Sequence, residues 1–267
     1  MIEAISAAVF GLLIGSFLNV CIQRLPEDES VVRPRSRCPQ CRHPIAWYDN
    51  IPLLSYLLLR ARCRHCQERI PARYPIVEAL TGALFAAGVA HFGLTLAAAK
   101  FCLLAALLVG LTFSDLETRI LPDELTLGGL AAGLALAWFL PMEPDIVSII
   151  VGLFGADWSA KGVSMAESAV GALIPAGMLW ASGALFQLIR GKEGLGLGDV
   201  KMLAMMGAFL GLRNTVFALI VGSLSGSVLG LIYIKLKRQD PGTYELPFGT
   251  FLGFAALLTL LLSLRTG

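Results

Sequence analysis

Charged residues are scarce in this chain of 267 residues: they make up 15% of it, against roughly a quarter of an average soluble domain. Hydrophobic residues reach 56%, and the mean hydropathy is +0.74. This shortage of charge excludes an ordinary soluble domain and predicts an integral membrane protein. The first apolar run also lacks the basic start and the A-x-A exit of a cleaved signal peptide, so we expect it to remain as a membrane helix.

Long apolar segments define the expected fold. A helix needs about 20 apolar residues to cross a bilayer, and eight segments approach that length. We therefore predict an all-α bundle of about eight transmembrane helices, divided into a first transmembrane helix (1–23), a loop domain (24–74) and a membrane bundle (75–267). The eight segments are 4–22, 75–92, 96–114, 124–140, 166–189, 200–212, 215–235 and 248–264.

Basic residues fall mostly on one side of this arrangement. Ten Arg lie in the loop 24–74, and seven more Lys or Arg lie on the same side, which makes 17 of the 21. The positive-inside rule places that side in the cytoplasm and both termini outside. The segment 141–165 then connects two helices on the outside, either as a surface loop or with an interfacial helix near 146–154. The seven are Arg119, Arg190, Lys192, Lys201, Lys235, Lys237 and Arg238.

Four of the six cysteines form two C-x-x-C pairs in the loop, Cys38 with Cys41 and Cys63 with Cys66. Each pair can offer two thiolates to one metal from a tight turn, and two pairs complete a tetrahedral site. Because four thiolates leave no open position, we predict a structural zinc. The alternative is four unligated thiols or a redox pair, although a reducing cytoplasm disfavours disulfides.

Two aspartates stand at the cytoplasmic ends of apolar segments. Asp115 ends the third segment, and Asp199 follows a glycine-rich stretch that contains Gly196 and Gly198. Two carboxylates brought together at such a place share one proton. That state suits peptide hydrolysis, since the ionised carboxylate deprotonates a water while the protonated one polarises the scissile carbonyl. The glycines allow a tight turn and a close approach to substrate.

Structural roles for these aspartates stay open on the residues alone. Asp199 can cap its helix, and Asp115 can pair with Arg119. Asp123 follows Pro122 just before the fourth segment, and we interpret it as a helix cap that could also orient Asp115.

Several motifs, taken in order, resemble those of the type IV prepilin leader peptidases, which also serve type II secretion and competence pseudopilins. Both C-x-x-C pairs and the two aspartates belong to this set. No single motif is decisive, but their combination and order are highly specific. The remaining motifs cover Gly15–Pro26, Trp47–Tyr56, Arg73–Gly82, Leu121–Asp123, Gly191–Lys201 and Leu246–Gly249.

The resemblance implies a membrane aspartyl protease of the GxGD type in the bacterial inner membrane. Asp115 and Asp199 would be catalytic, with Gly196, Gly198, Lys201 and Asp123 in support. The substrate would be a prepilin or pseudopilin whose short basic leader ends in Gly and is cut just before a hydrophobic helix. Besides these substrates and the lipid bilayer, no nucleic-acid partner is expected.

The resemblance also implies methylation of the new N-terminus with S-adenosylmethionine. Asp49 and Glu78 match acidic positions of motifs near that activity, although Asp49 also fits a turn. Family members often carry Gly where this chain has Ala61. The alternatives are a peptidase without methylation, a presenilin-like protease, whose Pro-Ala-Leu motif is absent here, and a zinc-bearing transporter or assembly scaffold.

Overall fold

The computed structural model describes residues 1–155, 157–191, 194–237 and 246–266, with side chains as far as 264. Lys192 and Arg238, two of the basic residues that predicted the orientation, lie outside these ranges. In the described ranges the regular structure is helical, and β pairing is limited to two isolated bridges in the cysteine loop. The prediction of an all-α fold is confirmed.

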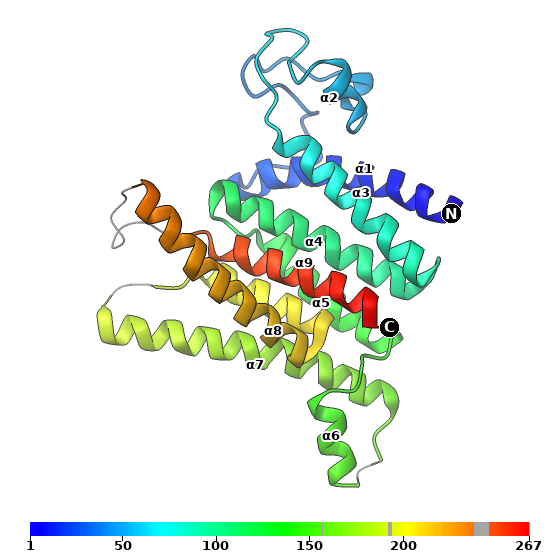
Figure 1. Ribbon diagram of the computed structural model, residues 1–267, viewed down its shortest axis with the longest axis vertical. Coiled ribbons are helices and arrows are strands. Elements are labelled where there is room, and N and C mark those ends of the chain that lie inside the picture. The colour runs from blue at the N-terminus through cyan, green and yellow to red at the C-terminus, as the bar shows by residue number, and fades with distance from the viewer. Residues whose placement is uncertain (156, 192–193, 238–245, 267) are drawn as a thin grey trace. The chain divides into compact units, whose positions relative to one another are not determined.

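The chain divides into two compact units, Met1–Phe113 and Ser114–Gly267. In the first unit, the cysteine loop forms a lobe joined to the ends of two helices that pack along each other (Figure 1). This unit groups the second apolar segment with the first helix and the loop, whereas the sequence suggested a boundary near residue 75. Its helices are α1 (Ile2–Arg24), α2 (Leu54–Leu58), α3 (Arg73–Phe92) and most of α4 (Leu96–Thr118).

The second unit begins with the last turns of α4 and contains the remaining helices. Its core is formed where α8 packs against α5, α7 and α9. Figure 1 shows α6 set apart from these helices, next to the start of α7. The helices are α5 (Asp123–Phe139), α6 (Ile146–Leu153), α7 (Ala160–Arg190), α8 (Leu197–Lys237) and α9 (Phe248–Thr266).

Each of the eight predicted apolar segments lies almost wholly within a helix, which supports an integral membrane protein. Length and composition identify five helices of the described chain as able to cross a membrane: α1, α3, α4, α7 and α8. A sixth apolar stretch, in α9, covers 248–264 and is shorter. The predicted number of eight spans is therefore not established by helix length.

The long helix α8 is interrupted at Gly211, where φ is 77° and ψ is 178°. Only glycine adopts this conformation without strain, because it has no Cβ. Figure 1 shows the chain changing direction within α8, so the helix consists of two parts. The sequence predicted two segments here, 200–212 and 215–235, and the interruption falls near the end of the first one. The backbone N–H of Arg213 donates to Oδ2 of Asp145, 2.9 Å away, which provides a partner for a donor beside the break.

The external connection is attached to α7 by a buried carboxylate. Oε1 of Glu167 accepts the backbone N–H groups of Asp145 and Ser148, at 2.9 and 2.8 Å, and the Ser148 hydroxyl at 3.0 Å. These bonds hold the first turn of α6. The expected helix near 146–154 is therefore present, and Leu153 and Phe154 at its end are exposed. Its placement at a membrane interface stays a prediction.

Helices α7 and α8 approach each other closely at two glycines. A Cβ added to Gly207 would overlap the backbone carbonyl of Gly171. The hydroxyl of Ser168 also donates to the carbonyl of Ala208, at 2.8 Å. Small residues permit such backbone contact, which drives helix association where lipid removes the usual hydrophobic gain.

We predict that Gly207→Ala destabilises the protein by about 3 kcal/mol or more, because the methyl group meets backbone that cannot rotate away. Gly177→Ala is the matched control, since nothing lies within 4 Å of a Cβ at that position of α7. Thermal unfolding in detergent would measure both variants. Equal stability of the two would contradict the packing described here.

Candidate active site and metal centre

Asp115 lies near the end of α4 and is 4% exposed. Its Oδ2 accepts two hydrogen bonds from Thr250, one from the backbone N–H at 2.6 Å and one from the hydroxyl at 2.7 Å. Thr250 belongs to the first turn of α9. Next to it, a Cβ added to Gly249 would lie 3.0 Å from Cγ of Asp115. The first turn of α9 thus surrounds one side of the carboxylate.

Asp199 is the third residue of α8 and is half-buried. Its backbone N–H donates to the carbonyl of Gly196 at 3.2 Å, which closes a tight turn before the helix. Gly198 packs against Leu121, 3.1 Å from the position of an added Cβ. Asp199 is close enough to Asp115 for the two carboxyl groups to interact electrostatically. The two predicted aspartates therefore lie in the same region of the second unit.

Asp123 does not cap α5 as the sequence suggested. The N-cap position is occupied by Pro122, and Asp123 is the first helical residue. Its two carboxylate oxygens accept hydrogen bonds from Nζ of Lys201, at 2.7 and 2.9 Å. Because Lys201 lies two residues after Asp199, this ion pair joins the start of α5 to the start of α8 beside the aspartates. The partner is 78 residues away in sequence, so local capping patterns could not reveal it.

The four cysteines of the C-x-x-C pairs meet at one point of the first unit. All four Sγ atoms lie within 4.8 Å of one another, and those of Cys38 and Cys66 are 3.8 Å apart. A tetrahedral site with Zn–S bonds of about 2.3 Å separates its sulfurs by about 3.8 Å. The cluster therefore fits one metal ion, as the spacing predicted. Backbone hydrogen bonds from Cys66 and His65 lower the pKa of the Cys63 thiol to about 7, whereas burial and the neighbouring thiols raise the pKa of Cys66 to about 11.

The two C-x-x-C turns have the same backbone geometry, 25 residues apart. In each turn, the N–H of the first cysteine donates to the carbonyl five residues later, and its carbonyl accepts the N–H four residues later. Arg42 and Gln67 occupy equivalent left-handed positions, with φ of 57° and 61°. The two isolated bridges, Arg37 with Pro44 and Arg62 with Arg69, also correspond. The two turns are thus structural equivalents, each giving two of the four thiols.

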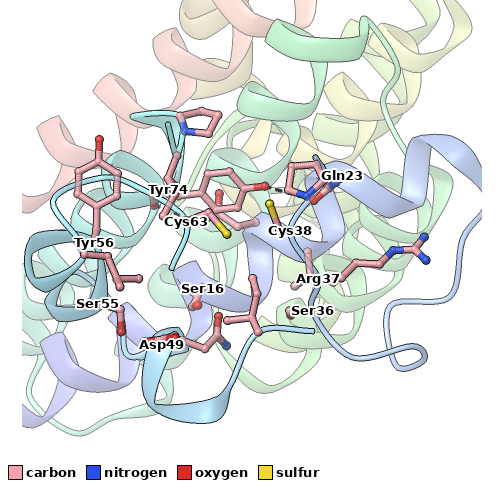
Figure 2. A pocket seen from close by; sticks show the side chains of 18 of the residues that line it. Ser16, Gln23, Ser36, Arg37, Cys38, Asp49, Ser55, Tyr56, Cys63 and Tyr74 are labelled. Carbon is pink, nitrogen blue, oxygen red and sulfur yellow. Dashed lines mark hydrogen bonds between the residues drawn. The ribbon is translucent and has the colours of Figure 1, made fainter. Parts of the chain in front are cut away.

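A cavity of about 430 Å³ lies between the cysteine loop and the ends of α1 and α3. Figure 2 shows Ser16, Asp49, Cys38 and Cys63 around it, with Tyr74 bonded through its hydroxyl to Gln23. Its volume falls within the usual range for a small-molecule site. Cys38 and Cys63 belong to its wall, so the four-cysteine site and the cavity share these two residues.

Both acidic residues assigned to methyl transfer line this cavity. Glu78 is 8% exposed, and its Oε2 accepts the N–H of Leu53 at 2.9 Å. Asp49 accepts two bonds from Arg64, at 2.6 and 2.8 Å, and these bonds hold the pKa of its carboxyl below the usual range. Asn19 also lines the cavity and is 2% exposed; among the described residues, its Oδ1 has no hydrogen-bond partner.

Ala61, where the resemblance to the family led us to expect Gly, lies outside the cavity lining. Its φ is 57°, in the left-handed region that favours glycine. Backbone conformation is therefore a sufficient reason for glycine at this position. The departure that separated this chain from the family pattern does not alter the wall of the cavity.

Two residues of these sites were missed by sequence reasoning. Thr250 directly follows the motif Leu246–Gly249, so its position beside that motif was the available signal. Asn19 lies inside the motif Gly15–Pro26 but carries no charge, and nothing local marks its amide oxygen as unpartnered.

Comparison with known proteins identifies the family of this chain. Residues 9–92 match the model of the bacterial peptidase A24 N-terminal domain, and residues 102–231 match that of the type IV leader peptidase family. A prepilin leader peptidase/N-methyltransferase of Aeromonas hydrophila is 40% identical over 277 residues, covering 95% of this chain and 88% of the relative. This chain belongs to the type IV leader peptidase family. The predicted class, a membrane peptidase, is confirmed.

A second relative is longer than the present chain. The prepilin leader peptidase/N-methyltransferase of Myxococcus xanthus (strain DK1622) is 45% identical over 241 residues, which are 90% of this chain but 66% of the relative. No solved structure matches the chain.

We predict that the purified leader peptidase contains about one zinc ion per chain, as a closed four-thiolate site requires. In a Cys38→Ser, Cys63→Ser variant the zinc should fall below roughly a tenth of that content, because two thiolates on separate turns do not close the site. Cys102→Ala, a buried cysteine of α4, is the control and should retain the metal. Metal analysis by mass spectrometry would measure all three, and full zinc content in the double variant would refute the ligand set.

Proposed function

We propose that this leader peptidase cuts the basic leader from type IV prepilins and type II secretion pseudopilins, with Asp115 and Asp199 as its catalytic pair. The observation that carries this proposal is the carboxylate of Asp115, which is buried yet accepts two hydrogen bonds and lies near enough to Asp199 for its charge to act there. An ionisable group in a membrane helix is costly, and it is retained where it has a function. The family membership supplies the reaction class.

Water activation by a pair of carboxylates accounts for the chemistry. The charge on one carboxyl disfavours a second charge beside it, so the pair holds one proton between its members. The ionised member removes a proton from water, while the protonated member donates to the carbonyl oxygen of the scissile bond. Lys201 and Asp123 fix the start of α8 and thus support the position of Asp199.

The proposed location is a bacterial inner membrane, with the cysteine loop and both aspartates on the cytoplasmic side. The ten Arg of the segment 24–74 support this orientation. A leader that is basic stays on the same side, and the hydrophobic helix after the cleavage site enters the bilayer. The scissile bond would then lie at the membrane surface, where both aspartates end or begin helices.

A zinc-bearing transporter or scaffold, or a protease of the presenilin type, would use these aspartates differently. A transporter does not need them for peptide hydrolysis. A presenilin-like enzyme would use such a pair but would not require a leader ending in Gly. Substrate choice and the effect of each aspartate therefore separate the three functions.

We predict that Asp115→Asn and Asp199→Asn each lower the rate of prepilin cleavage by about 10²- to 10⁴-fold, since each removes one partner of the proton exchange. Asp157→Asn, at an exposed position of the external connection, should cleave at the wild-type rate. Cleavage of a purified prepilin in detergent would be followed by mass spectrometry. Cleavage at the wild-type rate by either of the first two variants would show that Asp115 and Asp199 are not the catalytic pair.

We further propose that the cavity of the first unit binds S-adenosylmethionine and that this enzyme methylates the new N-terminus. When bound, that cofactor supplies an electrophilic methyl group. The unpartnered Oδ1 of Asn19 and the carboxylates of Glu78 and Asp49 fit a ligand that carries a positive charge and hydrogen-bond donors. The zinc would have a structural role, because it holds two residues of the cavity wall and has no open position.

We predict that Glu78→Gln lowers methyl transfer to a mature pilin by about 5- to 100-fold while leaving prepilin cleavage unchanged. The reason is that loss of one charge weakens binding of a cationic ligand by about 1–3 kcal/mol. Glu3→Gln, exposed in the first turn of α1, is the control. Transfer from labelled S-adenosylmethionine onto pre-cleaved pilin would measure the activity separately from cleavage. A wild-type enzyme that transfers no label would leave a peptidase only.

A further inference from the structure

Thr250 donates two hydrogen bonds to the same oxygen of Asp115. The backbone N–H and the side-chain hydroxyl both reach Oδ2, at 2.6 and 2.7 Å, and Thr250 is itself 3% exposed. An amide N–H can only donate, so Oδ2 must be an acceptor in this arrangement. Two donors on one carboxylate oxygen favour the ionised form of the group.

The helix to which Thr250 belongs adds to this preference. The donors sit in the first turn of α9, where backbone N–H groups lack partners within the helix and the helix dipole favours a negative charge. Gly249 lets the carboxylate approach, since a Cβ there would lie 3.0 Å from Cγ of Asp115. Asp115 therefore caps α9 from another helix, and a negative charge on Asp115 strengthens this interaction.

Asp199 lies in a different environment. Throughout the described ranges, no side-chain hydrogen bond or ion pair reaches its carboxyl group, and the nearby charge of Asp115 opposes a second negative charge. Among the described residues, Arg119, which directly follows the end of α4, is a positive group whose charge acts on Asp115. The surroundings of Asp115 thus favour its ionised form and those of Asp199 its protonated form, as a base and an acid require.

We propose that Thr250 is a positioning residue that keeps Asp115 ionised, so that Asp115 is the base and Asp199 is the acid of the cleavage reaction. This assignment rests on the proposed peptidase function. Asp115 takes a proton from water, whose oxygen bonds to the scissile carbonyl carbon, and Asp199 gives its proton to the carbonyl oxygen. The proton on Asp115 then passes to the leaving nitrogen as the C–N bond breaks, and one hydroxyl of the intermediate returns a proton to Asp199.

The test compares variants that remove the hydroxyl alone with variants that keep it. Thr250→Val is isosteric but lacks the donor, and Thr250→Ala provides the same loss if valine disturbs the fold. Thr250→Ser keeps the donor. Thr259→Val is the matched control on the same helix: Thr259 is 6% exposed, and its hydroxyl donates to the backbone carbonyl of Ala255, at 2.8 Å, rather than to a catalytic group.

Cleavage of a prepilin peptide by purified enzyme, measured over a range of pH, provides the readout. We expect Thr250→Val to lower kcat by roughly 10- to 100-fold with little change in KM, as loss of a bond to a charged group implies. The acid limb of the kcat profile should also move about one pH unit upward, because Asp115 loses a donor to its ionised form. Thr250→Ser and Thr259→Val should resemble the wild type in both respects.

Two results would overturn the assignment. One is a wild-type kcat and pH profile in both Thr250→Val and Thr250→Ala; the other is an equal loss of kcat at every pH, as a purely structural role would give. The variant Asp115→Asn distinguishes failure of this assignment from failure of the proposed peptidase function. If that variant is inactive while Thr250→Val behaves normally, the assignment alone is wrong; if it cleaves, the catalytic pair itself is wrong.

Discussion

A carboxylate inside an apolar helical bundle needs hydrogen-bond donors in place of the water it has lost. In this protein, those donors come from chain segments that would otherwise be loosely held. Asp115 takes its donors from the start of α9, Glu167 takes three from the start of α6, and Glu78 takes one from the N–H of Leu53 in the cysteine loop. Each buried acid thereby fixes the beginning of a helix or a loop to a membrane helix. The same bonds place the groups that carry the chemistry.

The carboxylates proposed for cleavage and those proposed for methyl transfer differ in their hydrogen-bond partners. Asp115 is held by two donors and Asp199 by none in the described chain, which suits a pair that must exchange protons. Asp49, in contrast, has both oxygens occupied by Arg64, so it retains its charge and is better suited to attract a ligand than to move a proton. Glu78 lies between these cases, buried against the cavity with one backbone donor.

Much of the architecture follows from composition and periodicity alone. The predicted apolar segments are helical, and the break predicted after residue 212 lies at Gly211. The spacing of the cysteines predicted that they lie together. These features depend on local sequence, where residue size and hydrophobicity decide the outcome. The C-x-x-C turns are a clear example, since each forms within eight residues.

The remaining features depend on contacts that no local pattern encodes. Thr250 and Asp115 are 135 residues apart, and Lys201 and Asp123 are 78 apart, so each pairing is decided by the packing of helices. Asp123 illustrates the error that follows: a carboxylate after Pro122 suggests a cap, yet Pro122 itself takes the N-cap position and the carboxylate bonds to a distant ammonium. The number of spans is undecided for a similar reason, because short helices such as α5 can be covered by their neighbours rather than by lipid.

The position of Cys38 and Cys63 in the wall of the cavity has a physiological consequence. Removing the metal would release both turns and with them the wall, whereas the hydrogen bonds around Asp115 all lie in the other compact unit. On the proposed functions, loss of zinc would stop the methylation of pilins before it stopped their cleavage. Pilins matured under such conditions would then carry unmethylated amino termini.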